Sequence, residues 1–518
     1  MFWEWLPSCF VRGEAAASAK GSRKVMLEGS EFQSLQVTVI TQTIKRRLQM
    51  SEEQGAFKTR VVPWPVDSYP SWGFSIVAGL QHILTLFGAT TLVPILFGQA
   101  MGMSPVQLGI LIASVYMVTG IATLIQCDSR IGSGLPIVQG SSFSFIPAAM
   151  IIFASVQKSG GGVNEMMQAL GGALFYGGIY ELVVGYSRLV GLLKKIVTPV
   201  VIGPTIMLIG FGLAGTAVST ASSNWIVSLL GVALIFVFAL IVKNKKLNAF
   251  PVFLSMITLY LVAVLGTVVG WFPAGSSMHI NFQAISGAPW LVWPTVFRYG
   301  SIGQTLKFNT LAFTAIIAAY TSSIIESIGD YHSISYASGL KDPSAKTISL
   351  GIGAEGLGCI ISGMMGGVGT TSYTENIGIV ALTGIASRRV IRTGAVILIV
   401  LGFLWKFGTV IGTIPSPIIG AAYLSLFGLI GALGLQVFTR ADVTSMRNLL
   451  IFGFAFTLGL GLPGYMAQHT IVFANAEWLA GIFNGLLKNG MAVGGITAGI
   501  LDNLIPGTDK ERGIGARE

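Results

Sequence analysis

The sequence predicts an all-α polytopic membrane protein with fourteen transmembrane segments, arranged as two inverted repeats of seven. Three observations lead to this fold class. Of the 518 residues, 53% are apolar and only 10% are charged, whereas a soluble globular protein carries roughly 25% charged residues. Apolar stretches long enough to cross a bilayer recur along the chain. Glycine, with 67 residues, is about twice as frequent as usual, which is typical of membrane helices that pack closely or break.

The predicted spans begin at residue 72, and each boundary is placed to within several residues. They are 72–97, 105–127, 137–153, 168–186, 196–216, 225–243, 250–271, 309–327, 348–365, 371–386, 390–413, 416–435, 446–463 and 477–501. The third and the tenth are short and polar. They are the weakest of the fourteen by hydropathy alone.

The basic residues give these spans an orientation. If the N-terminus lies inside, the short inner loops carry fourteen Lys and Arg residues and the outer connections carry three. This asymmetry is what the positive-inside rule describes, and omitting either weak span would reverse every later loop. We therefore expect a multi-pass protein of the plasma membrane with both termini in the cytoplasm.

The charged and sulfur-containing residues exclude other classes of protein. The net charge of +10 comes from the inner loops, so the sequence does not indicate nucleic acid as a partner. Cys9, Cys127 and Cys359 show no paired spacing, so we expect neither a disulfide framework nor a metal site. No cofactor is expected either.

Three segments are predicted to lie outside the bilayer. Residues 1–70 are read as a cytoplasmic, largely flexible extension, because they contain no apolar run long enough to span. Residues 273–308 form an extracellular loop rich in Trp, Pro and Phe, and residues 503–518 form a cytoplasmic tail. An alternative for the first segment is that translation begins at Met50.

The two polar spans indicate an internal duplication. Seven spans precede the long outer loop and seven follow it, so the second half must insert upside down. The polar spans are third in each half and their sequences are alike, GSSFSF at 140–145 and GTTSYT at 369–374. Such stretches favour a short extended strand followed by a half-helix, and paired interruptions of this kind indicate a transporter's binding site. The alternative is that these segments serve helix packing alone.

Five carboxylates lie within the spans or at their edges: Glu181, Glu326, Asp330, Glu355 and Glu375. Each costs roughly 2.5–3.5 kcal/mol at the centre of a membrane helix, so it must face a partner or a wet cavity. Glu326 and Asp330 are four residues apart in ESIGDY and share one helix face, and Glu375 begins the half-helix of the tenth span. A neutral heterocycle could donate its N–H groups to these carboxylates. Carboxylates that bind and release protons also supply the chemistry of a proton-coupled symporter.

Several of these residues have a structural alternative. Asp330 lies near the predicted cytoplasmic end of its helix and could be solvated. Glu355, in GIGAEGLG, could bond to the tenth span rather than to substrate, and Glu181 has no predicted partner and is expected to be structural. His82, which follows Gln81 in the first span, needs hydrogen-bond partners that the broken helices can supply, so we expect it to brace the site.

Four motifs in order resemble the nucleobase–ascorbate transporter family, also called nucleobase:cation symporter-2. They are QHILTLFGATTLVP (81–94), GSSFSF (140–145), ESIGDY (326–331) and ENIGIVALTG (375–384). The resemblance covers residues 70–505. It implies a homodimer in which a core domain of spans one to four and eight to eleven moves against a gate domain of the other six. The implied boundaries are 71–190 and 309–413 for the core, and 191–272 and 414–502 for the gate.

The resemblance also assigns roles to residues. Glu326 becomes the substrate-binding glutamate, Phe143 stacks on the base, and Glu375 takes the variable first position of a motif that continues with Asn376. The substrate-binding residues expected in this way are Glu326, Glu375, Phe143, Ser142, Asp330 and Thr374. Those expected to couple protons are Glu326, Asp330 and Glu355. The supporting residues are Gln81, His82, Asn376, Gly378 and Thr383.

Two features of these motifs indicate different substrates. Glutamate at 375 resembles the uracil permeases, whereas xanthine and urate members usually have glutamine there and ascorbate members have proline. Asp330 and Gly384, in contrast, look purine-like. The resemblance therefore implies proton-coupled symport of a nucleobase, with uracil favoured and xanthine or guanine as the alternative. Na⁺ in place of H⁺ stays open.

The sequence argues against two other classes of function. An anion transporter of the related sulfate-permease fold also has seven plus seven spans, but we expect it to avoid negative charge near its substrate and to carry a large cytoplasmic C-terminal domain. This chain has the acidic pair and a short tail. An enzyme is not expected, because no nucleophile is paired with a base and no metal-ligand set is evident.

Overall fold

The computed structural model describes residues 62–187, 196–243, 251–291, 293, 299–473 and 477–514. The chain divides into two compact units, Met1–Arg60 and Val61–Glu518, and all the described residues belong to the second. The predicted N-terminal extension up to residue 61 therefore lies outside the described residues. So do the basic inner loops at 188–195 and 244–250, and part of the predicted extracellular loop.

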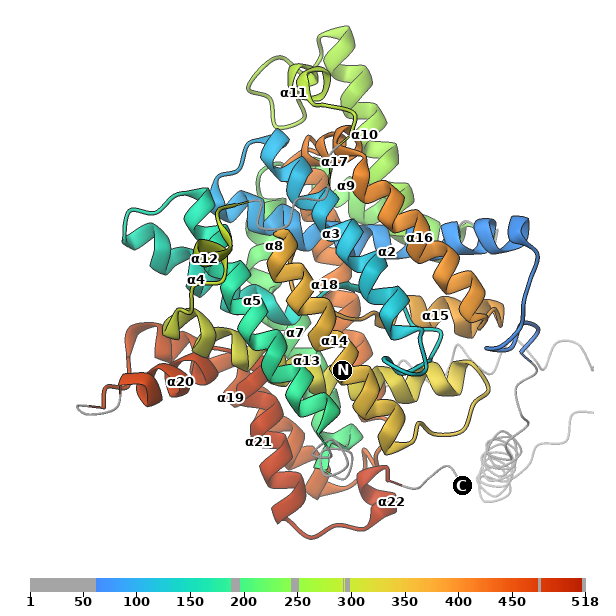
Figure 1. Ribbon diagram of the computed structural model, residues 1–518, viewed down its shortest axis with the longest axis vertical. Helices are drawn as coiled ribbons and strands as arrows, with labels where there is room; N and C mark the ends of the chain where they lie inside the picture. Colours follow the sequence, from blue (N-terminus) through green and yellow to red (C-terminus); the bar gives the residue numbers. More distant parts are fainter. Residues whose placement is uncertain are drawn as a thin grey trace, which may run out of the picture. The chain divides into compact units, whose positions relative to one another are not determined.

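Helices joined by short connections, with one pair of strands, make up the described part of the second unit (Figure 1). In chain order the elements are α2 (Trp72–Met101), α3 (Pro105–Gln126), β1 (Gln139–Ser141), η1 (Phe143–Phe145), α4 (Ile146–Lys158), α5 (Val163–Tyr186), α7 (Pro199–Gly212), α8 (Ala214–Ala221), α9 (Trp225–Phe236), η2 (Val237–Ile241), α10 (Pro251–Val269), α11 (Phe282–Gly287), α12 (Ile302–Thr305), α13 (Thr310–Ala337), α14 (Ala345–Met365), β2 (Thr370–Ser372), α15 (Thr374–Thr383), α16 (Arg388–Phe403), α17 (Trp405–Gly412), α18 (Ser416–Phe438), α19 (Met446–Gln468), α20 (Glu477–Leu487), α21 (Gly490–Leu504) and α22 (Asp509–Arg512).

Each predicted span coincides with a helix, a pair of helices, or a strand followed by a helix. Within the described ranges, eight helices are long and apolar enough to cross a membrane, or nine if the bent pair α16–α17 counts as one span. The apolar stretches formed by η1 with α4 and by α9 with η2 are shorter. These elements confirm the all-α membrane fold class, while the count of fourteen spans remains a prediction.

Both polar spans contain a short strand followed by a helix, as predicted. The strands β1 and β2 pair in antiparallel fashion, with the partners Gln139 and Ser372, Gly140 and Thr371, and Ser141 and Thr370. The half-helix α4 follows β1 through the short η1 turn, and α15 follows β2 after one residue. Because each strand supplies hydrogen-bond partners to the other, extended backbone can lie in the interior without unpaired polar groups.

The eighth span is longer than predicted. Its predicted end is residue 327, but α13 continues to Ala337, where Ser338 caps it and Gly339 turns the chain with a φ of +68°. The sequence after 327 has small and apolar residues that continue the buried face of the helix, among them Ile328 and Ile334. Asp330 therefore lies within the helix rather than at its end.

Two other predicted spans are interrupted. The eleventh bends by 82° between α16 and α17, where the indole N–H of Trp405 donates to the backbone oxygen of Val106 on α3 at 3.1 Å. The fourteenth breaks between α20 and α21. There the side-chain oxygen of Asn489 accepts hydrogen bonds from two backbone N–H groups in the first turn of α21, which favours a new helix start over a continuous helix.

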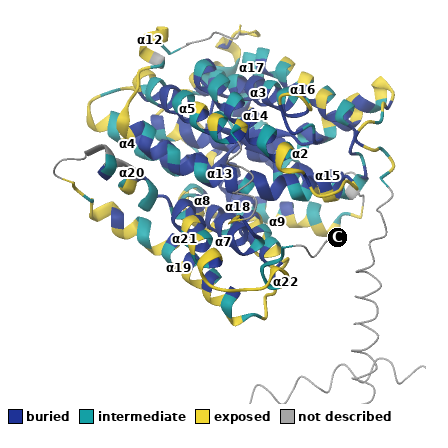
Figure 2. Ribbon diagram, turned by 60° about the horizontal axis from the view of Figure 1, so that its bottom comes forward, coloured by how far each residue is buried: buried dark blue, intermediate teal, exposed yellow. Residues whose placement is uncertain are grey.

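Glycine allows the helices around the strands to approach closely. The helix α5 lies against α14, α3 against α16, and α7 against α18. A Cβ atom on Gly185 would lie 2.2 Å from the backbone nitrogen of Gly353, and one on Gly178 would lie 2.8 Å from the backbone oxygen of Gly356. Figure 2 shows α13 and α14 among buried segments, whereas α19 carries many exposed residues. The abundance of glycine therefore reflects contact between helix backbones.

Replacing Gly185 by Ala tests this contact. The added methyl group must displace the backbone of α14, and we expect the Gly185→Ala variant to lose about 1–3 kcal/mol of stability. Gly453→Ala in α19 is the control, because it also replaces a helical glycine and nothing lies within 4 Å of the Cβ position there. Thermal unfolding in detergent, followed by tryptophan fluorescence, measures both. Equal midpoints for the two variants would contradict the close contact.

Candidate functional site

A small cavity lies where the two strand–helix segments meet α13. Its volume is about 20 Å³, close to the space that one water molecule needs. It is lined by Ser141, Ser142, Phe143, Ile206, Ile209, Glu326, Thr371, Ser372, Tyr373, Thr374, Glu375, Ile430 and Leu433. The isoleucines and leucine come from α7 and α18, and the other residues come from the strand–helix segments and α13. An organic ligand larger than water enters only when these two walls separate.

Two glycines and two aromatic rings hold the strand pair in place. A Cβ atom on Gly140 would lie 2.1 Å from the ring of Tyr373, and one on Gly369 would lie 2.6 Å from the ring of Phe145. Each segment thus places an aromatic ring of its own helix start over the glycine of the other. The Tyr373 hydroxyl also donates to the backbone oxygen of Ser141 at 3.3 Å. The similar motifs GSSFSF and GTTSYT therefore make equivalent glycine–aromatic contacts with each other.

Glu326 and Glu375 are the two carboxylates that line the cavity. Glu326 lies on α13 and accepts a hydrogen bond from the Ser144 hydroxyl at 3.0 Å. Glu375 lies in the first turn of α15, where the positive end of the helix dipole favours a negative charge. Both side chains are half-buried. The cavity therefore presents hydrogen-bond acceptors from two directions.

Asp330 lies one turn beyond Glu326 on α13 and joins that helix to the second strand segment. It is buried, and it accepts hydrogen bonds from Ser372 at 2.9 Å and from Thr374 at 2.8 Å. The alternative in which Asp330 is solvated at a helix end is wrong, because α13 continues past it. Asp330 is not among the residues that line the cavity, so it positions the start of α15 rather than contacting the cavity itself.

Glu355 is the acceptor of a second buried network. It receives hydrogen bonds from Ser327 at 2.6 Å, from Tyr331 at 2.6 Å and from Gln139 at 3.5 Å. These donors belong to α13 and β1, so Glu355 ties α14 to both elements. Glu181 of α5 is fully buried and interacts electrostatically with Glu355, yet neither of its oxygens has a hydrogen-bond partner within the described residues.

The carboxylates in this region lack cations. None of Glu326, Asp330, Glu355 and Glu375 takes part in an ion pair within the described ranges. Negative charges that lie near one another in a buried region repel, because the repulsion is poorly screened there. The described residues also contain no group of three His, Cys, Asp or Glu placed to hold a metal ion.

The supporting residues fall into two groups. The amide of Asn376 contacts His82 twice, donating to its backbone oxygen at 3.1 Å and facing its Nδ1 at 3.1 Å. These contacts join α15 to α2, and Gln81 lies beside His82, half-buried. The hydroxyl of Thr383 bonds within α15, and Gly378 is exposed with open space at its Cβ position. The last two are not brought to the cavity.

Phe143 lines the cavity and packs against an aromatic cluster on α18. Its ring meets that of Phe427 edge-on at 5.6 Å, and Phe427 stacks on Tyr423 at 5.2 Å. The Tyr423 hydroxyl donates to the backbone oxygen of Leu92 at 2.8 Å. The ring of Phe143 at the cavity therefore packs against α18, which belongs to the opposite wall.

The sequence pattern of the Permease family matches residues 73–467 of the chain. The chain belongs to the nucleobase–ascorbate transporter family. It is 33% identical over 496 residues to Solute carrier family 23 member 2 of Rattus norvegicus, with 87% of this chain and 76% of that protein covered. It is 30% identical over 480 residues to Nucleobase-ascorbate transporter 1 of Arabidopsis thaliana, with 87% and 90% covered. The family is one of transporters rather than enzymes, as the sequence predicts.

A solved structure shows the same fold at much lower identity. The transmembrane domain of a cyanobacterium bicarbonate transporter, BicA, aligns with a TM-score of 0.53 at 13% identity, over 81% of this chain and 99% of that domain. At this identity the similarity concerns the fold alone.

Sequence reasoning missed several residues of the site in this family member. Ser144 and Ser372 donate to Glu326 and Asp330, and both lie in motifs whose hydroxyls the sequence marks as unusual. Ile206 and Leu433 line the cavity as well. They carry no signal in the sequence, because an apolar residue that faces a cavity cannot be distinguished from one that faces lipid.

Replacing Asn376 by Leu tests the link between α15 and α2. The change removes the donor and leaves the buried Nδ1 of His82 without its partner, so we expect a loss of about 1–3 kcal/mol. Gly378→Ala is the matched control on the same helix and should have little effect, because its Cβ meets nothing. Thermal unfolding of Asn376→Leu, His82→Ala and the double variant gives the coupling energy. Additive losses would show that the two side chains are independent.

Proposed function

We propose that this chain is a secondary active transporter that carries a nucleobase together with a proton across the plasma membrane. The observation that supports this best is the pair Glu326 and Glu375 in one cavity between two half-helices. Membership of the nucleobase–ascorbate transporter family supports the transport of a small molecule. A homodimer with both termini in the cytoplasm is part of the same proposal.

The cavity suits a neutral, planar heterocycle. The N–H groups of a nucleobase donate to the carboxylates of Glu326 and Glu375, and its carbonyl oxygens accept from backbone N–H groups at the starts of the two half-helices. Phe143 supplies an aromatic face for the ring. Ser142 and Thr374 complete the polar lining, although the Thr374 hydroxyl is held by Asp330.

Proton coupling follows from the carboxylates without cations. In this proposal, Glu326 exchanges a proton as the nucleobase binds and leaves, because its hydrogen-bond partners then change. The hydrogen bonds of Asp330 and Glu355 then change too, because these carboxylates accept from the hydroxyls of Ser372 and Ser327, which lie in or beside the strand region. One charge moved across 100 mV is worth about 2.3 kcal/mol, enough for roughly 50-fold accumulation.

Alternating access requires the cavity walls to move apart. One wall consists of α7 and α18, which belong to the proposed gate domain (191–272 and 414–502). The other consists of the strand–helix segments and α13, which belong to the proposed core domain (71–190 and 309–413). A cavity of about 20 Å³ cannot hold a nucleobase, so movement of one domain against the other must open it on either side.

Uracil is the preferred substrate in this proposal, with xanthine or guanine as the alternative. The acidic pair disfavours ascorbate, which the relatives' names also mention, and sulfate, because both are anions. Gly384 does not favour a purine by itself. It has a φ of +68°, and a Cβ atom there would lie 2.5 Å from Pro63, so local packing already excludes a larger residue.

Uptake into proteoliposomes tests the substrate. With an acidic exterior, we expect labelled uracil to accumulate, xanthine or guanine to compete, and ascorbate and sulfate to be excluded by the carboxylates. Collapse of the pH gradient should abolish the accumulation while leaving equilibration. Uptake of sulfate or ascorbate without any nucleobase uptake would refute the proposal. Accumulation that follows a Na⁺ gradient instead would correct the coupling ion.

Glu326→Gln tests the proton role. The amide keeps the shape of the side chain but removes its charge, so we expect uracil binding to weaken by about 10- to 100-fold and the response to pH to disappear. Asp342→Asn, an exposed acidic residue in the loop after α13, is the matched control and should transport normally. Coupled transport that survives unchanged in Glu326→Gln would remove Glu326 from the mechanism.

A further inference from the structure

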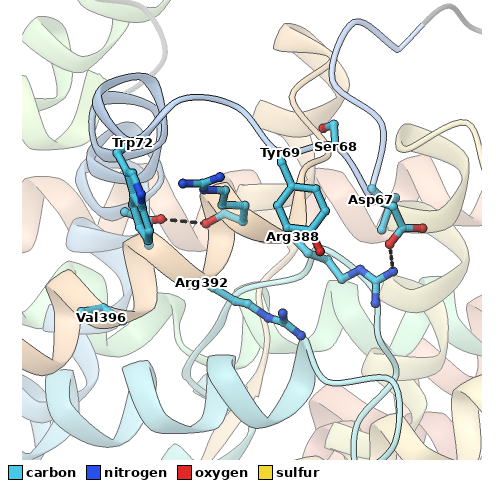
Figure 3. A pocket seen from close by; sticks show the side chains of 10 residues that line it. Asp67, Ser68, Tyr69, Trp72, Arg388, Arg392 and Val396 are labelled. Carbon is cyan, nitrogen blue, oxygen red and sulfur yellow. Dashed lines mark hydrogen bonds and ion pairs between the residues drawn. The ribbon is translucent and has the colours of Figure 1, made fainter.

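A second, larger cavity lies at the start of α16, away from the strand pair. Its volume is about 560 Å³, and its walls come from two stretches that are distant in sequence. Figure 3 shows Asp67 and Tyr69 from the chain that leads into α2, Trp72 at the start of that helix, and Arg388 and Arg392 from the first two turns of α16. Nothing in the proposed transport mechanism uses this cavity.

The segment that leads into α2 is fixed in place by backbone hydrogen bonds. Residues 64–68, which we call the strap, run parallel to residues 384–388. The N–H of Trp64 donates to the oxygen of Gly384 at 3.2 Å, and the N–H of Arg388 donates to the oxygen of Val66 at 3.0 Å. The Ser387 hydroxyl donates to the oxygen of Ser68 at 2.7 Å. The cavity is therefore preformed.

The cavity is positively charged. Three guanidinium groups line it, those of Arg388, Arg389 and Arg392, against the single carboxylate of Asp67. Arg388 pairs with Asp67, so the charge of that arginine is neutralised. Arg389 lies over the Trp72 ring at 4.2 Å, a contact that leaves its charge available.

Among the described residues, Arg392 also uses only part of its hydrogen-bonding capacity. One of its guanidinium nitrogens donates to the backbone oxygen of Cys127 at 2.8 Å, and a guanidinium has five N–H donors. The charge of Arg392 also reaches Asp128, in the loop after α3. The pKa of Asp128 lies below its usual value, mainly because the backbone N–H of Arg130 donates to it, and Arg392 adds to this effect. Asp128 is not part of the cavity lining.

The outer edge of the cavity is apolar and continues onto the membrane-facing surface. Trp72 is 67% exposed and Val396 is 51% exposed, and both line the cavity. Beyond them, exposed apolar residues continue along the outward faces of α2 and α16, namely Ile76, Val77 and Val400. Tryptophan at such a position is typical of the interface between bilayer and water. The arginines lie at the start of α16, the end of this span that the positive-inside rule assigns to the cytoplasmic side.

We infer that this cavity binds the phosphate group of an anionic phospholipid from the cytoplasmic leaflet. Guanidinium groups match the geometry of phosphate oxygens, and basic pockets between membrane helices on this side suit lipid head groups. The acyl chains lie along Val396 and the apolar faces beyond it. A basic interior with an apolar edge fits a lipid better than a soluble anion, because a soluble anion has no apolar part to contact that edge.

Thermal unfolding of the full chain in detergent tests the assignment. The midpoint is measured during titration with phosphatidylglycerol, with phosphatidylcholine of the same acyl chains, and with inorganic phosphate or glycerol 3-phosphate. A ligand that binds only the folded chain raises the midpoint. We expect a saturable rise with phosphatidylglycerol alone. An equal rise with phosphatidylcholine, or with either soluble phosphate at the same concentration, would overturn the proposal.

Variants then locate the site. Each arginine near an anionic head group contributes about a fivefold gain in binding, so Arg392→Gln should raise the half-saturating concentration about fivefold, and Arg389→Gln with Arg392→Gln about 25-fold. The corresponding double change to Lys, which keeps both charges, should retain most of the binding. Lys341→Gln, a change of an exposed basic residue in another predicted inner loop, should match the parent. Unchanged titrations in both Gln variants would show that the lipid binds elsewhere.

Discussion

Inside a bilayer, a backbone N–H or C=O group without a partner costs several kcal/mol, which is why membrane chains are helical nearly everywhere. In the antiparallel pair of β1 and β2, two buried non-helical segments satisfy each other's backbone groups. This pairing lets two helices begin in the protein interior. The cavity, its two half-helices and the carboxylates around them all depend on it. The close fit of Tyr373 on Gly140 and of Phe145 on Gly369 keeps the two segments at this distance.

The carboxylates divide by what they contact. Glu326 and Glu375 line the cavity, whereas Asp330 and Glu355 accept hydrogen bonds from hydroxyl groups of neighbouring elements. A change in protonation at either of the last two would alter how firmly α13 is joined to the strands and to α15. Among the residues that the structure describes, these carboxylates therefore form a connected set of acceptors with no cation paired to them. In such a set, a proton taken up at one carboxylate changes the hydrogen bonds available to the next.

Much of this arrangement can be predicted from the sequence, and the features that cannot be predicted share a physical cause. The fold class, the strands and the half-helices follow from hydropathy, loop charge and the two polar motifs. Polar residues in a bilayer need hydrogen-bond partners or a wet cavity, so their positions mark irregular structure. The bend at Trp405 and the break at Asn489 depend on contacts with partners distant in sequence or on local capping, which hydropathy does not record. Asp330 is buried because α13 runs farther than its composition suggests. The apolar wall of the cavity cannot be identified from the sequence, since Ile206 resembles any lipid-facing residue.

The strap has a consequence for how far the chain can be shortened. Its contacts begin at Trp64, so a polypeptide that starts at Met50 retains every one of them. A polypeptide that starts at residue 70 lacks the strap, and the backbone oxygen of Gly384 then loses its partner Trp64. Gly384 ends α15, the helix that carries Glu375. The strap thus joins the chain before α2 to the end of a half-helix more than three hundred residues downstream.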